Sequence, residues 1–415
     1  MLSRKELSKL KTTELKKICK SQGCKDYKHL SKKELVIHCA DCPRIKTKKT
    51  KKQVLKGVAK FNKIDGPVSF TAVTLPNQNN KLVLLFGDQH DLPQGTCNGC
   101  KMNRRCTTLF NWLMEYFESV TACTDLFLEF ATVFEDVKYA DMLYRRQLKV
   151  GGDLLMNQII SRFGDCVQND EKCQEQWGNM RVHMTDTRDT SGLYEFFTTF
   201  QEINKKYELT NKDLDNMKNI IYIVLRYYIG AQNILLPGSE KEVGTIEQEL
   251  EYLNTMLERH FGQYSPNFKI KNIANTRKRF QKQLNGIIDE NMRNKIIDYI
   301  VENINSLHDQ TQTVEDLGSY MALIMDIYLL PRLFKQSLDD SQISIIYAGD
   351  EHIERYAYFL VGHIEDSKIL VNHSYELDVK CIKLSKQEQK RLSNHIYKKI
   401  KPHECSRKKR ELFKS

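Results

Sequence analysis

The sequence lacks the motifs that mark the commonest nucleotide-dependent and serine-dependent enzymes. It has no Gly-x-x-x-x-Gly-Lys-Ser/Thr phosphate loop, no Gly-x-Gly-x-x-Gly dinucleotide fingerprint and no Gly-x-Ser-x-Gly nucleophile turn. Each of these motifs is a backbone geometry that presents a phosphate site or a serine at the end of a strand. Their absence weighs against a nucleotide-driven enzyme and against a serine hydrolase.

The chain also lacks an uncharged apolar stretch long enough to span a bilayer. Residues 220–236 come closest, but Arg226 interrupts them, so a buried helix is expected there. The N-terminus runs from Met1 straight into charged residues rather than into an apolar segment, so no secretory signal is expected. We expect a protein that stays inside the cell, in the cytoplasm, the nucleus or a virion, and is not secreted.

The charge of this 415-residue chain is unevenly spread. Its net charge is +11, yet residues 1–60 hold 19 Lys/Arg against 5 Asp/Glu, and residues 386–415 hold 11 against 3. Residues 61–385 therefore carry an excess of acidic side chains. Basic ends on an acidic body suggest nucleic acid or another anionic partner. The alternative is that the lysine runs are solvated tails that keep the protein soluble.

The first 45 residues predict two short helices joined by a short loop. Apolar residues from Leu7 to Cys19 have helical spacing, Gly23 is a candidate helix end, and Ser31 with Glu34 forms a capping-box pattern. The pattern Leu-Lys-x-Ile-Cys-Lys-x-x-Gly followed by Lys-Lys-Glu-Leu resembles SAP domains, which bind DNA. That resemblance implies lysines meeting phosphates, with residues 46–65 as a basic linker.

A pair of matching segments is the strongest signal in the body of the chain. Val83–Phe86 leads into Gly-Asp-Gln-His ending at His90, and Ile345–Ala348 leads into Gly-Asp-Glu-His ending at His352. A short apolar run bounded by glycine predicts a buried strand. Ligands bind beyond the carboxyl ends of parallel strands, so Asp88, His90, Asp350 and His352 are expected at one edge. The alternative is that both motifs are strand-to-loop turns, with Gly for conformation and Asp for capping.

Two further segments have the same form. Residues 125–130 are an apolar run broken by Glu129, and a carboxylate in a buried strand is costly unless it is paired or binds a metal. Residues 181–189 alternate and then become charged, as a strand running into a polar loop would, and end near Arg188. Arg188 could clamp a carboxylate or stabilise an oxyanion. An edge-strand Glu and a surface Asp–Arg pair are the alternatives.

This order of motifs resembles the erythromycin esterase/TIKI/TraB superfamily. Members carry two Gly-x-x-His motifs, a Glu ending an early strand and an Arg, which here fall on Gly87 and His90, Glu129, Arg188, and Gly349 and His352. The resemblance spans roughly residues 80–365 and is carried by these short motifs alone. Some members have Gly-Glu-x-His in the first motif. This chain has the shorter Asp88 at that position and so departs from their pattern.

The resemblance implies a hydrolase, metal-assisted or not, that cleaves an ester or amide bond. His90, Glu129 and His352 would hold a divalent metal ion or act as acid/base groups, with Asp88 and Asp350 beside them. Arg188 would stabilise the developing negative charge. The alternative is a non-enzymatic DNA-binding or virion structural protein on a degenerate hydrolase fold, acting through its basic ends.

The twelve cysteines permit two interpretations. Cys97, Cys100 and Cys106 follow the first His motif, and Cys166 and Cys173 flank a polar loop. They could bind zinc, although no second pair follows at matching spacing, or form disulfides that join the two loops. Disulfides inside a cell would suit a large cytoplasmic DNA virus, since such viruses carry their own oxidation system. A further cluster (Cys19, Cys24, His38, Cys39 and Cys42) could bind zinc or simply pack in the small domain.

The predicted fold is α/β, with a mixed or parallel central sheet flanked by helices over residues 66–385. Apolar spacing predicts a large helical insertion at about 191–338, with helices at 194–207, 212–236, 245–260, 285–307 and 314–333, and Pro331 as a late break. A strand is the alternative for 220–228. A helix over 353–361, with Glu354 and Arg355 placed to orient His352, a strand over 368–373 and a basic tail from 386 complete the chain.

Overall fold

The structure is a computed structural model, and it divides the chain into two compact units, Met1–Gly57 and Val58–Ser415. It describes residues 8, 11–16, 29–41, 61–78, 80–89, 97, 105–120, 122–131, 158, 162–163, 177, 180–187, 191–207, 210–230, 234–235, 242–243, 246–262, 273–287, 289–314, 316–335, 342–374 and 380–398.

The first unit contains the predicted capping box. Helix α3 (Lys32–Asp41) begins after Ser31, whose backbone N–H donates to the Glu34 carboxylate (2.8 Å). The Glu34 N–H donates in turn to the Ser31 hydroxyl (3.4 Å). Leu15, in a helical stretch over 12–16, and Leu35 are both fully buried. Two helical segments, each with a fully buried leucine, are therefore present, as the spacing predicts.

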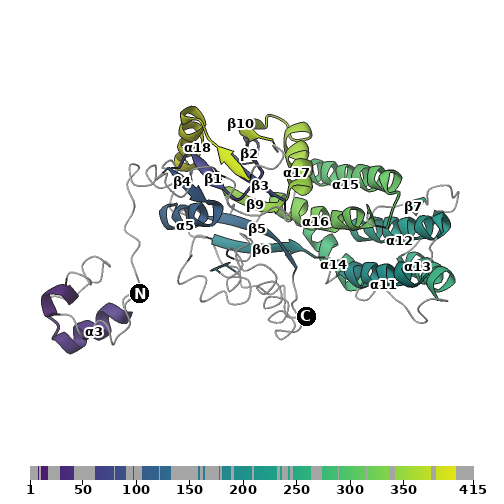
Figure 1. Cartoon of the computed structure of the whole chain (residues 1–415), viewed down its shortest axis with the longest axis horizontal. Coiled ribbons are helices and arrows are strands. Elements are labelled where there is room, and N and C mark those ends of the chain that lie inside the picture. The colour runs from purple at the N-terminus through teal and green to yellow at the C-terminus, as the bar shows by residue number, and fades with distance from the viewer. Residues whose placement is uncertain are drawn as a thin grey trace. The chain divides into compact units, whose positions relative to one another are not determined.

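The second unit is built on a six-stranded sheet in the order β10-β2-β3-β9-β5-β6 (Figure 1). The strands are β2 (Ser69–Leu75), β3 (Lys81–Asp88), β5 (Thr124–Ala131), β6 (Met180–Asp186), β9 (Ile343–Gly349) and β10 (Lys368–His373). Strands β3, β9, β5 and β6 are mutually parallel, while β2 runs antiparallel to both of its neighbours, β3 and β10. The predicted α/β class and all five strands expected from the sequence are confirmed.

The register brings the two Gly-Asp motifs side by side. Gly87 pairs with Ala348 and Asp88 pairs with Gly349, so the motifs lie on adjacent strands, offset by one residue. Although more than 250 residues separate them in the sequence, the carboxyl ends of both strands reach the same sheet edge.

A small sheet, β11-β1-β4, extends this unit. Strand β1 (Lys63–Asp65) pairs with β11 (Cys381–Lys383) and β4 (Cys106–Thr108). Since β1 lies inside the stretch expected to be linker, the linker ends before Lys63. Residues at the start of the expected basic tail form helix α18 (Lys386–Lys398).

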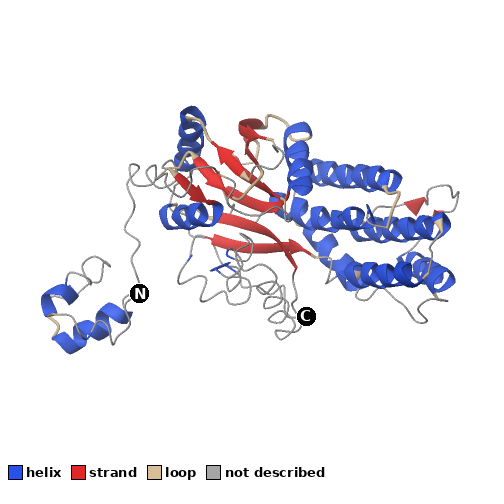
Figure 2. Ribbon diagram, viewed as in Figure 1, coloured by secondary structure: helices blue, strands red, loops and turns tan. Residues whose placement is uncertain are grey.

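Helices cover both faces of the large sheet (Figure 2). On one face, α5 (Leu109–Ser119) packs through an aromatic series in which the Phe86 and Trp112 ring centroids lie 5.5 Å apart and those of Trp112 and Tyr116 lie 5.4 Å apart. On the other face, Val83, Leu85 and Ile346 join one buried cluster with the helical insertion.

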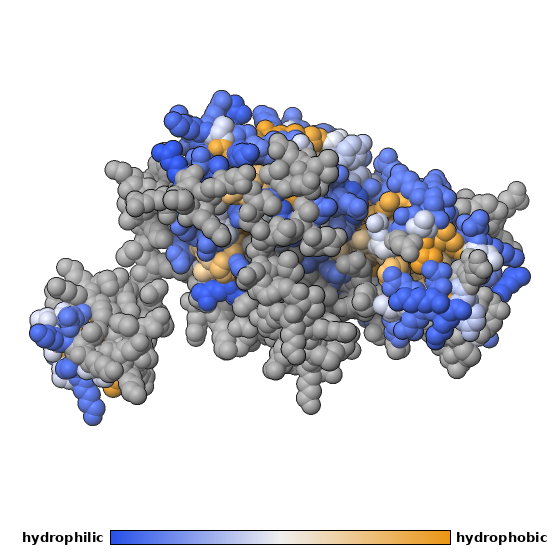
Figure 3. Space-filling model, viewed as in Figure 1, coloured by the Kyte–Doolittle hydropathy of each residue, from blue (hydrophilic) through white to orange (hydrophobic). Residues whose placement is uncertain are grey.

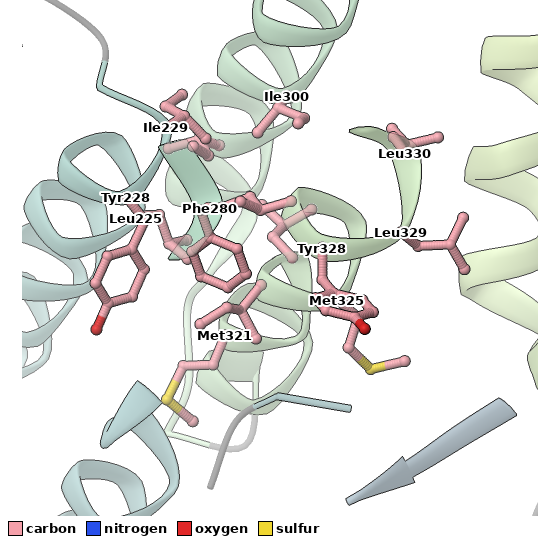
Figure 4. Close-up of a cluster of buried hydrophobic side chains, with 14 of the residues drawn as sticks. Leu225, Tyr228, Ile229, Phe280, Ile300, Met321, Met325, Tyr328, Leu329 and Leu330 are labelled. Carbon is pink, nitrogen blue, oxygen red and sulfur yellow. The ribbon is translucent and has the colours of Figure 1, made fainter. Parts of the chain in front are cut away.

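The insertion consists of long helices lying side by side (Figure 1). They are α11 (Leu193–Lys206), α12 (Asn211–Ile229), α13 (Ile246–Phe261), α14 (Ile273–Leu284), α15 (Glu290–Gln310) and α16 (Asp316–Phe334). Figure 4 shows how α12, α14 and α16 bring Tyr228, Phe280, Met321 and Tyr328 together. In the view of Figure 3, hydrophilic residues and a hydrophobic patch share the described surface of this block.

Several predicted boundaries in the insertion are wrong. Helix α12 ends at Gly230, which adopts a left-handed conformation (φ 69°), and Ile234–Leu235 form the short strand β7, paired with β8 (Glu242–Val243). The strand alternative for 220–228 is also wrong, because these residues are helical. The sequence did not predict α14, and Pro331 lies inside α16 rather than ending it.

Helix α16 is the one described helix long and apolar enough to cross a membrane, and 83% of its apolar window is buried inside the fold. A buried core helix passes the same test, so no membrane span is assigned to α16.

Candidate functional site

The carboxyl edge of the parallel strands gathers three of the predicted carboxylates. Asp88 ends β3, Glu129 lies near the end of β5, and Asp350 follows β9 as the first residue of helix α17 (Asp350–Gly362). The Glu129 carboxylate accepts a hydrogen bond from the Gly349 backbone N–H and so ties the end of β5 to the turn between β9 and α17. This is the edge at which ligands bind in parallel sheets.

Asp350 is held by a neighbour from strand β2. The Ser69 hydroxyl donates to Asp350 Oδ1 in a short hydrogen bond. Oδ2 of the same carboxylate takes no part in that bond. Both side chains crowd the backbone of Gly87. A Cβ atom there would lie 2.1 Å from Asp350 Oδ1 and 2.2 Å from Ser69 Oγ. The first motif therefore needs glycine for space, not for conformation.

We expect Gly87→Ala to break the Ser69–Asp350 hydrogen bond and to lower the free energy of unfolding by about 1–3 kcal/mol, as overpacked sites do. Urea unfolding of the full chain measures this change. Gly318→Ala in α16 is the matched control, because its nearest neighbour would be Phe197 Cζ at 3.8 Å, an ordinary contact. An equal loss in both variants would contradict the steric role assigned to Gly87.

Asp88 and Asp350 have different electrostatic surroundings. The buried Asp88 carboxylate forms an ion pair with the Lys380 ammonium, with Nζ and Oδ1 3.1 Å apart. Asp350 is half-buried. Burial raises the pKa of its carboxyl, the negative charges of Asp88 and Glu351 add to the rise, and the Ser69 hydrogen bond opposes it. When the environments of two neighbouring carboxyl groups differ in this way, the two groups can take different roles in catalysis. One can act through its charge while the other accepts and releases a proton.

His352 lies on the first turns of α17, buried in a charged pocket. Its Nδ1 atom is 2.9 Å from Asp326 Oδ1 on α16 and 2.9 Å from Arg355 Nη2. The Arg355 Nε donates to Asp326 Oδ2 at 2.9 Å. Burial alone would raise the pKa of Asp326, but Arg355 and His352 together hold it below its usual range. Nδ1 of His352 is thus occupied, and its Nε2 is the ring nitrogen left for another partner.

The structure thus assembles four of the six predicted catalytic residues around one end of the sheet. Arg355 contacts His352, as its proposed orienting role requires, whereas Glu354 is exposed to solvent. His90 and Arg188 lie outside the described residues. Sequence reasoning missed Ser69, Asp326 and Lys380. Of these three residues, only Asp326 is marked in the sequence, because it is a carboxylate in the middle of the most apolar helix.

No family model, curated protein or solved structure matches this chain. The geometry of the site therefore carries the functional argument by itself.

The described part of the chain contains no group of three His, Cys, Asp or Glu side chains close enough to hold a metal ion. Of the three predicted ligands, Glu129 and His352 are described and His90 is not. The described residues do not by themselves make a ligand set, so no chemical step is assigned here to a metal.

The cysteines form disulfides where the structure describes them. Cys97 bonds to Cys381, which joins the chain beyond the first motif to strand β11, and Cys106 and Cys123 are also disulfide-bonded. Zinc binding by Cys97 is therefore wrong, and its partner is not in the loop flanked by Cys166 and Cys173. The disulfide lies next to Lys380 in the sequence and so fixes the strand end that supplies the partner of Asp88. Cys100, Cys166, Cys173, Cys19, Cys24 and Cys42 lie outside the described residues, as do the side chains of His38 and Cys39.

Proposed function

We propose that the chain is a hydrolase that cleaves an ester or amide bond at the carboxyl edge of the sheet. The observation that carries this proposal is the pair formed by Asp88, which forms an ion pair with Lys380, and Asp350, whose half-buried carboxyl has a raised pKa. A carboxylate with a raised pKa is a stronger base toward water than an ordinary Asp.

In the proposed reaction Asp350 is the general base. Its Oδ2 takes a proton from water while Ser69 holds Oδ1, and the water oxygen attacks the carbonyl carbon of the substrate. The tetrahedral intermediate then collapses, and the proton passes from Asp350 to the leaving alcohol or amine. Arg188, which follows the end of β6 by two residues in the sequence, is proposed to stabilise the oxyanion. His352 offers Nε2 as a second proton-transfer group, since Asp326 and Arg355 occupy Nδ1.

The experiment is hydrolysis of a panel of aryl esters and peptide amides by the full chain, beside an Asp350→Asn/His352→Gln double variant. Circular dichroism checks that both proteins are folded. Hydrolysis by the wild type that disappears in the double variant supports the proposal. A wild type that hydrolyses no member of the panel, or a double variant as active as the wild type, contradicts it.

The alternative use of these residues is a divalent metal ion bound by His90, Glu129 and His352, in which His352 Nε2 would be a ligand instead of a proton-transfer group. It would polarise the carbonyl or activate the water. Metal analysis of the purified wild type beside a His90→Ala/His352→Ala variant tests it. Stoichiometric metal that is lost in the variant supports the metal, whereas equal metal in both proteins places it elsewhere.

We also propose that the first unit tethers the enzyme to nucleic acid. Lys32 and Lys33 are exposed at the start of α3, where an ammonium group can meet a phosphate. Removing residues 1–57 should weaken binding to duplex DNA and reduce the dependence of the affinity on salt. Unchanged affinity and salt dependence would refute this role. The result also separates tethering from catalysis, which the deletion should leave intact.

A further inference from the structure

A group of basic side chains lies at the opposite end of the sheet from the proposed site. Arg332 is in the last turn of α16, Lys335 follows that helix, and Arg279 projects from α14, which packs against α16. Lys81, the first residue of β3, donates from Nζ to the Leu333 carbonyl at 2.7 Å and so marks the amino edge of the strands. At about 3.3 Å per residue, the length of β3 puts roughly 20 Å between this edge and Asp88.

Arg332 is held in place by a buried network. Its Nε donates to Nδ1 of His183 at 2.9 Å, and Nε2 of His183 lies 2.9 Å from Asp125 Oδ1. Burial and the charge of Arg332 lower the pKa of His183 to about 3, so the ring is neutral at physiological pH. With Nδ1 accepting from Arg332, the ring proton is on Nε2 and points to Asp125. The two Nη nitrogens of Arg332 make no hydrogen bond to the described residues.

These cations lack acidic partners in the described part of the chain. Asp125, the nearest acid in the network, is already bound by Arg181 through two contacts of 2.6 and 2.9 Å. No described carboxylate lies within ion-pair distance of Arg279, Arg332 or Lys335. Each is only partly exposed.

The charge of Arg332 opposes the charges of both Arg279 and Lys335. Burial lowers the pKa of Arg279, and the charge of Arg332 lowers it further. Burial likewise lowers the pKa of Lys335, with Arg332 and Lys282 adding to the effect. The stem of Lys335 is pressed against the end of α14, since its Cε would lie 2.9 Å from a Cβ at Gly286. Partly desolvated like charges are unfavourable unless an anion joins them.

We propose that Arg279, Arg332 and Lys335 bind a phosphate group, either as the free dianion or as the monoester end of a small molecule. Guanidinium groups match the oxygens of a phosphate with paired, charge-assisted hydrogen bonds, and three positive charges suit a charge of about −2 better than they suit a single carboxylate. Tyr328 belongs to the same place, because the Arg332 guanidinium carbon lies 5.6 Å from its ring centroid. This inference is independent of the proposed hydrolase.

The test is isothermal titration calorimetry of the full chain with inorganic phosphate and, in parallel, with adenosine monophosphate. We expect saturable binding that Arg279→Gln and Lys335→Gln each weaken by roughly 10- to 100-fold, the loss of one hydrogen bond to a charged group. Neither side chain donates a hydrogen bond within the described protein, so both variants should fold. Lys278→Gln, which removes an exposed charge one residue from Arg279 on the same helix, should bind like the wild type.

The two ligands distinguish free phosphate from a phosphate monoester, and the variants distinguish this site from the carboxyl edge and from non-specific binding. Equal affinity for the two ligands identifies phosphate alone as the ligand, and tighter binding of the nucleotide identifies a monoester. Asp350→Asn should bind phosphate like the wild type, which distinguishes this site from the carboxyl edge. Absence of saturable phosphate binding overturns the proposal. So does an equal loss of affinity in Lys278→Gln, or the same heat from chloride at matched ionic strength.

Discussion

Replacing Asp350 with asparagine is expected to lower kcat/KM for a hydrolysed ester or amide by about 10²- to 10⁴-fold, the usual contribution of a general acid or base. Asparagine keeps the size of the side chain and can still accept a hydrogen bond from Ser69. The change therefore removes the proton acceptor and little else. Steady-state kinetics on a substrate found in the hydrolysis panel measure the effect.

Glu354→Gln is the matched control for that variant. Glu354 lies on the same helix and loses the same charge, but it is exposed and has no part in holding His352. We expect its kcat/KM to stay within about twofold of the wild type, since an exposed charge contributes little. If the two variants lost activity equally, the effect would belong to the net charge of α17, and Asp350 would not be the base.

Asp326→Ala should produce the largest loss of stability. Asp326 is 2% exposed and is the anion between Arg355 and His352. Its removal leaves the Arg355 guanidinium largely buried without a counter-charge, which costs about 3–5 kcal/mol. Urea unfolding of the full chain measures the change in the free energy of unfolding.

Two further variants test whether the loss of stability in Asp326→Ala comes from the unpaired Arg355 cation. Asp298→Ala, at an exposed position on α15, should change the free energy of unfolding by no more than about 0.5 kcal/mol. Asp326→Ala/Arg355→Met should recover part of the loss, because the unpaired cation is gone. If Asp326→Ala alone unfolded like the wild type, the buried network would not stabilise the join between α16 and α17.

The strands that carry the motifs were predictable because parallel strands are buried on both faces. Strands β3 and β9 are nearly continuous apolar runs that end in glycine and aspartate. Short runs of this kind are typical of strands that are buried on both faces. Strand β2 was missed although its signal is present, since Ser69–Leu75 alternates polar and apolar residues between the turn residues Gly66-Pro67 and Pro76-Asn77. The three-residue strands β1, β4 and β11 are too short for any periodicity.

The meeting of Asp88, Glu129 and Asp350 follows from strand direction, which is why the sequence could predict it. Their partners could not be predicted in this way. Ser69 is 281 residues from Asp350, and Lys380 is 292 residues from Asp88. Neither Ser69 nor Lys380 lies in a motif. Such contacts depend on where segments that are distant in the sequence join the sheet. The spacing of residues within one segment does not predict this.

Helix boundaries in the insertion failed for a local reason. Residues 212–236 keep their apolar spacing beyond Ile229, but Gly230 adopts a left-handed conformation that ends the helix there. Pro237-Gly238, just beyond the predicted helix, is a stronger sequence signal for a helix end than Gly230, so the predicted end came too late. Helix α14 was missed because it is rich in Lys, Arg and Gln, with Phe280 and Leu284 as its buried apolar side chains.

The dependence of kcat/KM on pH, measured for the wild type and for Asp350→Asn, tests whether Asp350 is the general base. A base is active when it has lost its proton, so wild-type activity should rise with pH through the pKa of Asp350, above the usual range for an aspartate. That rise should be absent from the residual activity of Asp350→Asn. The same rise, at the same pH, in both proteins would show that another group is the base and would contradict the account.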